Sequence, residues 1–201
     1  MTGTAPESSP LPRADVGNRT PLEIRLRPNA ILHRFFSSGY DLIYFYRGQD
    51  GRLNAPSHTY GVLYAAKTAH GAFAETFLRN PGRTLLPTDL LTSKAYVTIE
   101  VLRPMKLVRM AGPGLARIGA TAQVVHGGKP YHGPQAWSEA LYRHPGNFDG
   151  IAYNARHDDE ALCYAIFERA SAALREASRE TNHDQDWFWD IAETYGVGLA
   201  P

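Results

Sequence analysis

Two residues of opposite charge, Arg52 and Glu75, are the first candidates for chemistry in this sequence. Arg52 lies in residues 51–56, where glycine, asparagine and proline favour a loop. Glu75 lies on or beside the apolar stripe of a segment in which alanine and phenylalanine recur at helical spacing. A carboxylate in that place is costly to bury unless a charged group meets it. We therefore expect Arg52 and Glu75 to face one another across a cleft.

The elements that position this pair are short. Residues 62–66 form an apolar run that predicts a buried strand, and Thr68 is placed to cap the helix that follows. One strand therefore joins the loop of Arg52 to the helix of Glu75. On spacing alone, a structural ion pair without any function explains the two residues equally well, because buried ion pairs also occur outside functional sites.

A second arginine, Arg34, lies inside an apolar run at residues 31–36 that predicts another strand. Its charge must find an anion, a carboxylate or an exit to solvent. Pairing within the fold is the structural alternative to a role in binding.

The composition suits a single globular domain. The chain has 201 residues, 43% of them apolar, and a formal net charge of +1. A nearly neutral chain has no general attraction to nucleic acid or to an anionic membrane. No apolar run is long enough to cross a bilayer, and the N-terminus has no signal-peptide pattern. We therefore expect a cytoplasmic protein.

Metal and disulfide chemistry are not indicated. The single cysteine, Cys163, lies in an apolar run and excludes an internal disulfide or a cysteine-cluster metal site. The eight histidines never fall in a ligand pattern such as H-x-x-x-H on a helix. The sequence therefore predicts neither a metal centre nor a prosthetic group.

Strand and helix signals alternate along the chain without the regular spacing of parallel crossover units. This pattern predicts an α+β fold with a mixed, largely antiparallel sheet flanked by helices. We expect a flexible tail at residues 1–20 and one domain at residues 21–201. Residues 95–110 are expected to form a hairpin of two strands, and residues 170–180 a helix.

Several short motifs, in their order along the chain, resemble the RES domain family, which is named for an arginine, a glutamate and a serine. They are HRF at residues 33–35, GRLN at 51–54, YAA at 64–66 and AFAE at 72–75. The resemblance continues into DGIAYNARHD at residues 149–158. It covers most of the chain and identifies the expected domain as RES-like.

The resemblance implies both a fold and a function. The fold would have a core similar to that of ADP-ribosyltransferases, and the protein would be the toxin of a bacterial toxin–antitoxin pair. Such toxins consume NAD by breaking its nicotinamide–ribose bond, with water, phosphate or a protein as the acceptor. The implied partner is an Xre-like helix-turn-helix antitoxin that binds over the pocket. This chain itself is not expected to bind nucleic acid.

Carried over to this sequence, the catalytic residues are Arg52 and Glu75. Glu75 would stabilise an oxocarbenium-like transition state and hydrogen-bond a ribose hydroxyl. Arg52 would bind the pyrophosphate through its forked guanidinium, and Arg34 would be a second phosphate or ribose contact. Tyr64 would stack on or orient the nicotinamide ribose.

The sequence departs from the family pattern at two further candidate substrate contacts. Phe35 stands where the family commonly has tyrosine, and Ala155 stands where it has serine. Three explanations are open for Ala155. Asn154 or a water replaces the serine, catalysis is weaker by roughly 1–3 kcal/mol for one lost hydrogen bond, or the chain is not catalytic.

Two functions besides NAD cleavage therefore stay open. One is a binding module that keeps the pocket without turnover and sequesters a nucleotide or a partner protein. The other is a domain with no small-molecule site.

Overall fold

An eight-stranded sheet organises the chain. In this computed structural model, which describes residues 10–80 and 82–200, the strand order is β1-β6-β7-β8-β3-β2-β5-β9. All neighbouring strands are antiparallel except β6 and β7, which run parallel. The predicted mixed, largely antiparallel sheet is therefore confirmed. Its strands are β1 (Glu23–Leu26), β2 (Ile31–Ser37), β3 (Val62–Ala66), β5 (Lys94–Val101), β6 (Met105–Arg109), β7 (Gly150–Ala155), β8 (Asp158–Phe167) and β9 (Leu174–Glu180).

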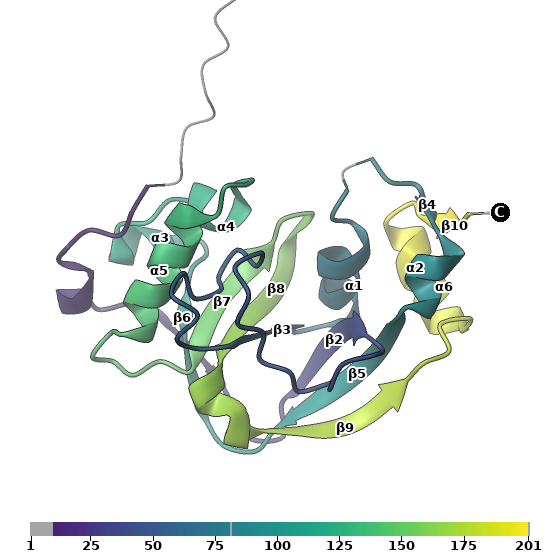
Figure 1. The fold of residues 1–201 in the computed structure, drawn as a ribbon, viewed down its shortest axis with the longest axis horizontal. Helices are drawn as coiled ribbons and strands as arrows, with labels where there is room; N and C mark the ends of the chain where they lie inside the picture. The colour runs from purple at the N-terminus through teal and green to yellow at the C-terminus, as the bar shows by residue number, and fades with distance from the viewer. Residues whose placement is uncertain (1–9, 81, 201) are drawn as a thin grey trace, which may run out of the picture.

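Helices stand in two groups along this sheet (Figure 1). The first group lies beside β6 and β7 and contains α3 (Pro113–Ile118), α4 (Gln123–His126) and α5 (His132–Tyr142). The second lies beside β2 and β5 and contains α1 (Ala69–Phe77), α2 (Thr88–Thr92) and α6 (Asp186–Thr194). Short 3-10 turns, η1 (Val16–Asn18) and η2 (Glu168–Ala173), and a small parallel pair, β4 (Leu85–Leu86) with β10 (Gly198–Leu199), complete the fold. None of the helices in the described segments has the length and apolar character needed to cross a bilayer.

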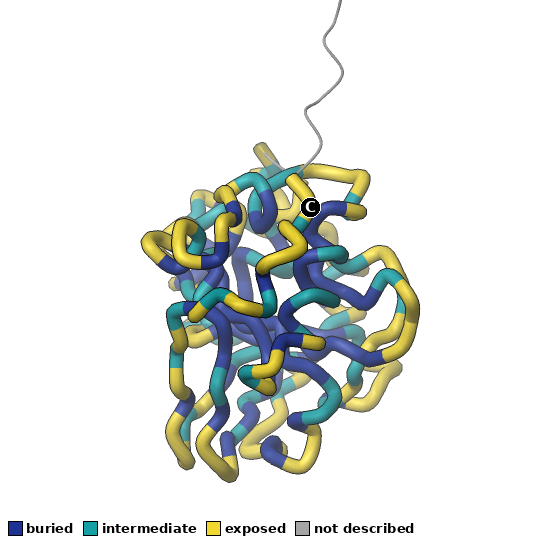
Figure 2. The backbone as a smooth tube through the Cα atoms, turned by 90° about the vertical axis from the view of Figure 1, so that its left-hand side faces the viewer, coloured by how far each residue is buried: buried dark blue, intermediate teal, exposed yellow. Residues whose placement is uncertain are grey.

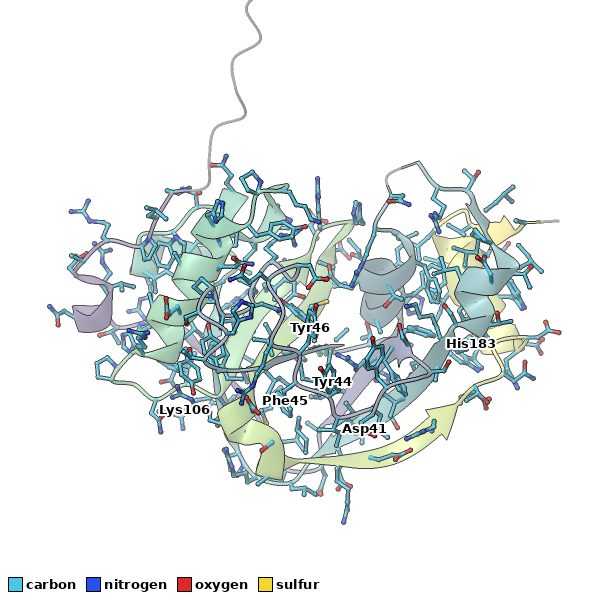
Figure 3. All side chains as sticks on the ribbon, viewed as in Figure 1. Asp41, Tyr44, Phe45, Tyr46, Lys106 and His183 are labelled. Atoms are coloured by element: carbon cyan, nitrogen blue, oxygen red, sulfur yellow. The ribbon has the colours of Figure 1, made fainter. Side chains whose placement is uncertain are left out.

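Alternation along the strands builds a core on each side of the sheet. In β3, Val62 and Ala66 join the core under the helices, which we call the helical-face core. Leu63 and Ala65 join the core on the other side, which the segment at residues 42–46 covers with side chains such as Phe45. We call this second core the loop-face core. Figure 2 shows the buried interior with exposed turns around it, and Figure 3 shows Tyr44, Phe45 and Tyr46 on the covering segment.

The sheet opens between β2 and β3. β2 pairs with β5 along its whole length, from Ile31 opposite Glu100 to Ser37 opposite Lys94. Its described pairing with β3 is limited to His33 opposite Ala66. At this gap the Tyr64 carbonyl accepts a hydrogen bond from the side chain of Arg34, and the gap separates the two halves of the sheet.

The α1 helix packs closely over β3 and β8. Thr68 caps it as predicted, because its hydroxyl accepts a hydrogen bond from the Gly71 amide at 3.2 Å. A Cβ atom on Gly71 would lie 3.1 Å from the Cβ of Ala66 and 3.3 Å from that of Ala161. Glycine thus lets the helix approach the sheet, which fixes the height of Glu75 above it.

The predicted helix at residues 170–180 is wrong. These residues form most of η2 and then β9, an edge strand that pairs with β5. Most β9 side chains are exposed, so the sequence has no burial pattern to oppose its helix-favouring Ala, Arg and Glu residues. Cross-strand contacts decide the outcome, among them Ser178 with Thr98 at 2.6 Å and Arg175 with Glu100 at 2.7 Å.

The predicted hairpin at residues 95–110 is also wrong. β5 pairs with β2 and β9, whereas β6 pairs with β1 and β7. The chain therefore crosses from one half of the sheet to the other after Val101. The local sequence of two short apolar strands does not indicate which strands they will pair with.

Part of the predicted tail is ordered against α5. Val16 is buried, and the carbonyl of Pro10 accepts a hydrogen bond from the Trp137 indole at 2.8 Å. The carbonyl of Arg19 lies 3.2 Å from the ring nitrogen Nε2 of His144. These contacts anchor residues 10–20 to α5, although the composition of this segment favours disorder. Residues 1–9 lie outside the described residues.

Candidate functional site

The loop that carries Arg52 is held against α5 by buried polar side chains. The Gln135 side-chain amide donates to the carbonyl of Gly51 at 3.1 Å, and the Ser138 hydroxyl donates to the carbonyl of Leu53 at 2.6 Å. A Cβ atom at position 51 would lie 2.3 Å from the Asn54 side-chain oxygen, so the turn requires glycine there. The loop is thus part of the rigid body of the protein.

Tyr64 fastens the same loop from β3. Its hydroxyl accepts a hydrogen bond from the Leu53 amide and donates one to the Asn54 side-chain oxygen, both at 2.9 Å. Burial raises the pKa of Tyr64 well above its usual value, so the hydroxyl keeps its proton. That proton is already used within the protein, and Tyr64 can offer a ligand its ring but not a free donor.

Arg52 has no carboxylate partner among the described residues. Its Nε donates to the carbonyl of Gly127 at 3.3 Å, and its guanidinium lies 5.4 Å from the centre of the Tyr131 ring. Both contacts orient the side chain without neutralising it. A positive charge therefore remains for an anion.

Glu75 projects from the last turns of α1 toward the end of β7. Its Oε2 accepts a hydrogen bond from the Tyr153 hydroxyl at 3.0 Å, and its Oε1 accepts one from the Arg156 amide at 3.3 Å. The residue is only partly buried. Two neutral donors therefore orient the carboxylate, and no described cation forms an ion pair with it.

The structure brings Arg52 and Glu75 to one region without joining them in an ion pair. Burial is the main cause of the raised pKa of Tyr64, and beyond it Arg52 lowers that pKa while Glu75 raises it. Burial is also the main cause of the lowered pKa values of His126 and His157, on which the same two charges again act in opposite senses. Both charges thus act on the same side chains, with opposite effects on their pKa values.

Arg34 lies at the gap between β2 and β3. Its Nη1 donates to the carbonyl of Tyr64 at 2.6 Å, while its buried Nε has no hydrogen-bond partner among the described residues. Burial, and then the positive charge of Arg79, lower the pKa of Arg34 to about 10. The guanidinium is therefore still charged at neutral pH, and it has no described carboxylate within ion-pair distance.

Three other candidate residues are engaged in packing or hydrogen bonds within the protein. Phe35 is buried among aromatic rings, including Phe77 and Phe188, with ring centres 5.0 and 6.0 Å away. The Asn154 amide donates to the carbonyl of Asp159 and so closes the turn after β7. Ala155 is fully buried in the helical-face core. Roles for these residues in substrate binding stay predictions.

Sequence reasoning missed Tyr153 and Arg156 as partners of the carboxylate. Tyr153 occupies an inward position of β7, where an aromatic residue predicts packing. The contribution of Arg156 is its backbone amide, which no residue pattern reveals. Their place on either side of Ala155, inside the motif at residues 149–158, was the available signal.

Two surface hollows lie near the charged groups. One, of about 310 Å³, includes Gln49, Tyr131 and Gln135 in its lining, and the other, of about 470 Å³, includes His157 and Asp158. Neither has Arg52 or Glu75 in its lining. The described residues also contain no group of three or more His, Cys, Asp or Glu side chains suited to a metal ion.

Replacing Tyr64 by phenylalanine should loosen the Arg52 loop. The change removes the acceptor of the Leu53 amide and the donor to Asn54, and should cost about 1–3 kcal/mol of unfolding free energy. Hydrogen exchange at the Leu53 amide should become faster than in the wild type, while exchange in β6 changes only with global stability. An unchanged exchange rate at Leu53 would contradict the anchoring role of Tyr64.

The sequence matches the model of the RES domain over residues 31–190. The fold is similar to that of a chain in the crystal structure of the M. tuberculosis MbcT-MbcA toxin-antitoxin complex, with a TM-score of 0.58 and 15% sequence identity. That alignment covers 77% of this chain and 85% of the other. No curated protein matches the sequence. Because the family match extends over most of the chain, this protein belongs to the RES domain family.

Proposed function

We propose that this chain is the toxin of a toxin–antitoxin pair and that it cleaves the nicotinamide–ribose bond of NAD. The observation that carries the proposal is that Arg34 and Arg52, both held through Tyr64, have no described carboxylate partner, while neutral donors orient the carboxylate of Glu75. Membership in the RES family supports it. The similar fold in a toxin–antitoxin complex is consistent with it.

NAD matches these charges. Its pyrophosphate is a double anion, which the guanidinium groups of Arg34 and Arg52 can bind without first breaking an ion pair. Positive charge develops on the ribose as its bond to nicotinamide breaks, and the Glu75 carboxylate can stabilise it. The bonding electron pair passes to the nicotinamide nitrogen and neutralises it. The acceptor oxygen, from water, phosphate or a protein, then bonds to the ribose carbon and loses its proton.

A binding module without turnover is the second candidate. It is favoured by Ala155, which has no hydroxyl and is fully buried. In the first candidate, the carboxylate needs no serine because the protein already supplies Glu75 with two hydrogen bonds. Measuring nicotinamide release separates the two.

The proposal includes a protein partner. A toxin that consumes NAD in the cytoplasm must be blocked there until it is needed, and a helix-turn-helix antitoxin of the Xre type would do so by covering Arg34 and Arg52. Two unpaired cations make an acidic segment or a chain end with a free carboxylate the natural occupant. Nucleic-acid binding would then belong to the partner.

Replacing Glu75 by glutamine should abolish NAD consumption. The amide removes the negative charge but keeps an oxygen that can accept a hydrogen bond from Tyr153, so the thermal midpoint should stay nearly unchanged. Release of nicotinamide from NAD, measured with and without inorganic phosphate, should fall at least about a hundredfold. Glu176→Gln on the exposed edge strand is the matched control and should act like the wild type. A wild-type protein that binds NAD but releases no nicotinamide would favour the binding module.

Replacing Arg34 by methionine should stabilise the protein without ligand. The change removes a buried charge that has no described counterion, so the thermal midpoint should rise. ADP-ribose should raise the midpoint of the wild type but have little effect on Arg34→Met, because the anion contact is gone. Arg25→Met, at an exposed ion pair on β1, is the control and should keep the ligand effect. An equal ADP-ribose shift in Arg34→Met and wild type would contradict the anion site.

The antitoxin should protect the site arginines from modification. Phenylglyoxal labels accessible guanidinium groups, so Arg52 should react in the free chain and resist in a complex with a co-expressed helix-turn-helix partner. Arg25 is exposed and provides the internal reference, since its labelling should not change. Peptide mass spectrometry gives both values in one sample. Equal labelling of Arg52 in the free and bound protein would place the partner elsewhere.

A further inference from the structure

The orientation of Glu75 depends on one end of β7. Tyr153 reaches Oε2 through its hydroxyl, and Arg156 reaches Oε1 through its backbone amide. Arg52 makes no ion pair with this carboxylate. The two contacts therefore come from either side of Ala155, the position at which this sequence lacks the family's serine.

A phenol is suited to this task because it stays neutral. Tyr153 is almost fully buried, and burial together with the charge of Glu75 raises its pKa well above its usual value. The hydroxyl therefore remains a donor throughout the neutral pH range. It fixes the direction of the carboxylate and leaves the negative charge in place, whereas an ion pair would neutralise that charge.

Packing also restricts Tyr153 itself. Its ring belongs to the helical-face core, together with Phe73 and Phe77 of α1. The hydroxyl is thus carried by a buried ring on a central strand, and the carboxylate by a helix that packs against the same sheet. A donor held in this way has little rotational freedom to lose when the transition state forms.

We infer that Tyr153 is the residue that positions Glu75 beside the substrate's ribose centre, where the carboxylate stabilises the positive charge that develops as the bond to nicotinamide breaks. The inference rests on the proposed NAD cleavage. Tyr153 works through Glu75 and does not itself contact the substrate. Its contribution should therefore appear in the rate of the chemical step and not in substrate affinity.

The test compares Tyr153→Phe with the wild type in nicotinamide release from NAD. Loss of the hydroxyl removes one charge-assisted hydrogen bond, so kcat should fall about tenfold or more. KM, and the Kd for NAD measured by calorimetry, should stay within about twofold. Tyr164→Phe is the matched control, because Tyr164 is equally buried on the neighbouring strand β8 but belongs to the loop-face core. It should retain wild-type kcat once rates are normalised to the folded fraction.

The outcomes separate this inference from the proposal on which it rests. No nicotinamide release from the wild type would overturn the proposed function, and with it any role for Tyr153 in the reaction. Release by the wild type and by Tyr153→Phe at equal kcat would overturn only the inference. A higher KM with unchanged kcat would also overturn it, because Tyr153 would then contact substrate. Equal losses in Tyr153→Phe and Tyr164→Phe would show a general packing effect and reject the positioning role.

Discussion

Tyr64 connects the two arginines of the site. Its backbone carbonyl accepts the hydrogen bond from Arg34 at the gap between β2 and β3. Its hydroxyl holds the Leu53 amide and the Asn54 side chain, and so fixes the loop on which Arg52 lies. This one residue therefore sets the spacing of two positive charges that belong to different parts of the fold. The helix of Glu75 follows directly after β3, the strand that contains Tyr64. The position of the carboxylate therefore also depends on this strand.

The separation of charges is the main electrostatic property of the site. Arg34 and Arg52 have no described counterions, and Glu75 is met by neutral donors. Buried ion pairs often contribute little to stability because desolvation offsets their attraction. A buried charge without a counterion destabilises the folded state more than a buried ion pair does. A fold that keeps such charges is therefore less stable than it could be. Such local cost is common where a ligand or transition state supplies the missing partner.

The surrounding fold explains how this cost is tolerated. Two apolar cores lie on opposite faces of the sheet, and Arg34 lies where the sheet opens. Loops are often the mobile part of a functional site. Here, hydrogen bonds from buried polar side chains of α5 hold loop 48–55 in place. Preorganised charges need little rearrangement when a ligand binds, which is the usual source of large electrostatic effects in enzymes.

Local patterns in the sequence determined the strand at residues 62–66, the capped helix after Thr68 and the glycine turn before Arg52, because each depends on neighbours in the chain. The family motifs likewise indicated Arg34, Arg52 and Glu75 by residue type. Only the tertiary structure decided that Arg52 and Glu75 do not pair, since hydrogen bonds from Tyr153 and the Arg156 amide come from far along the chain. It also decided that residues 174–180 form an edge strand and that β5 and β6 separate, because strand pairing over long sequence distances is set by packing of the whole sheet.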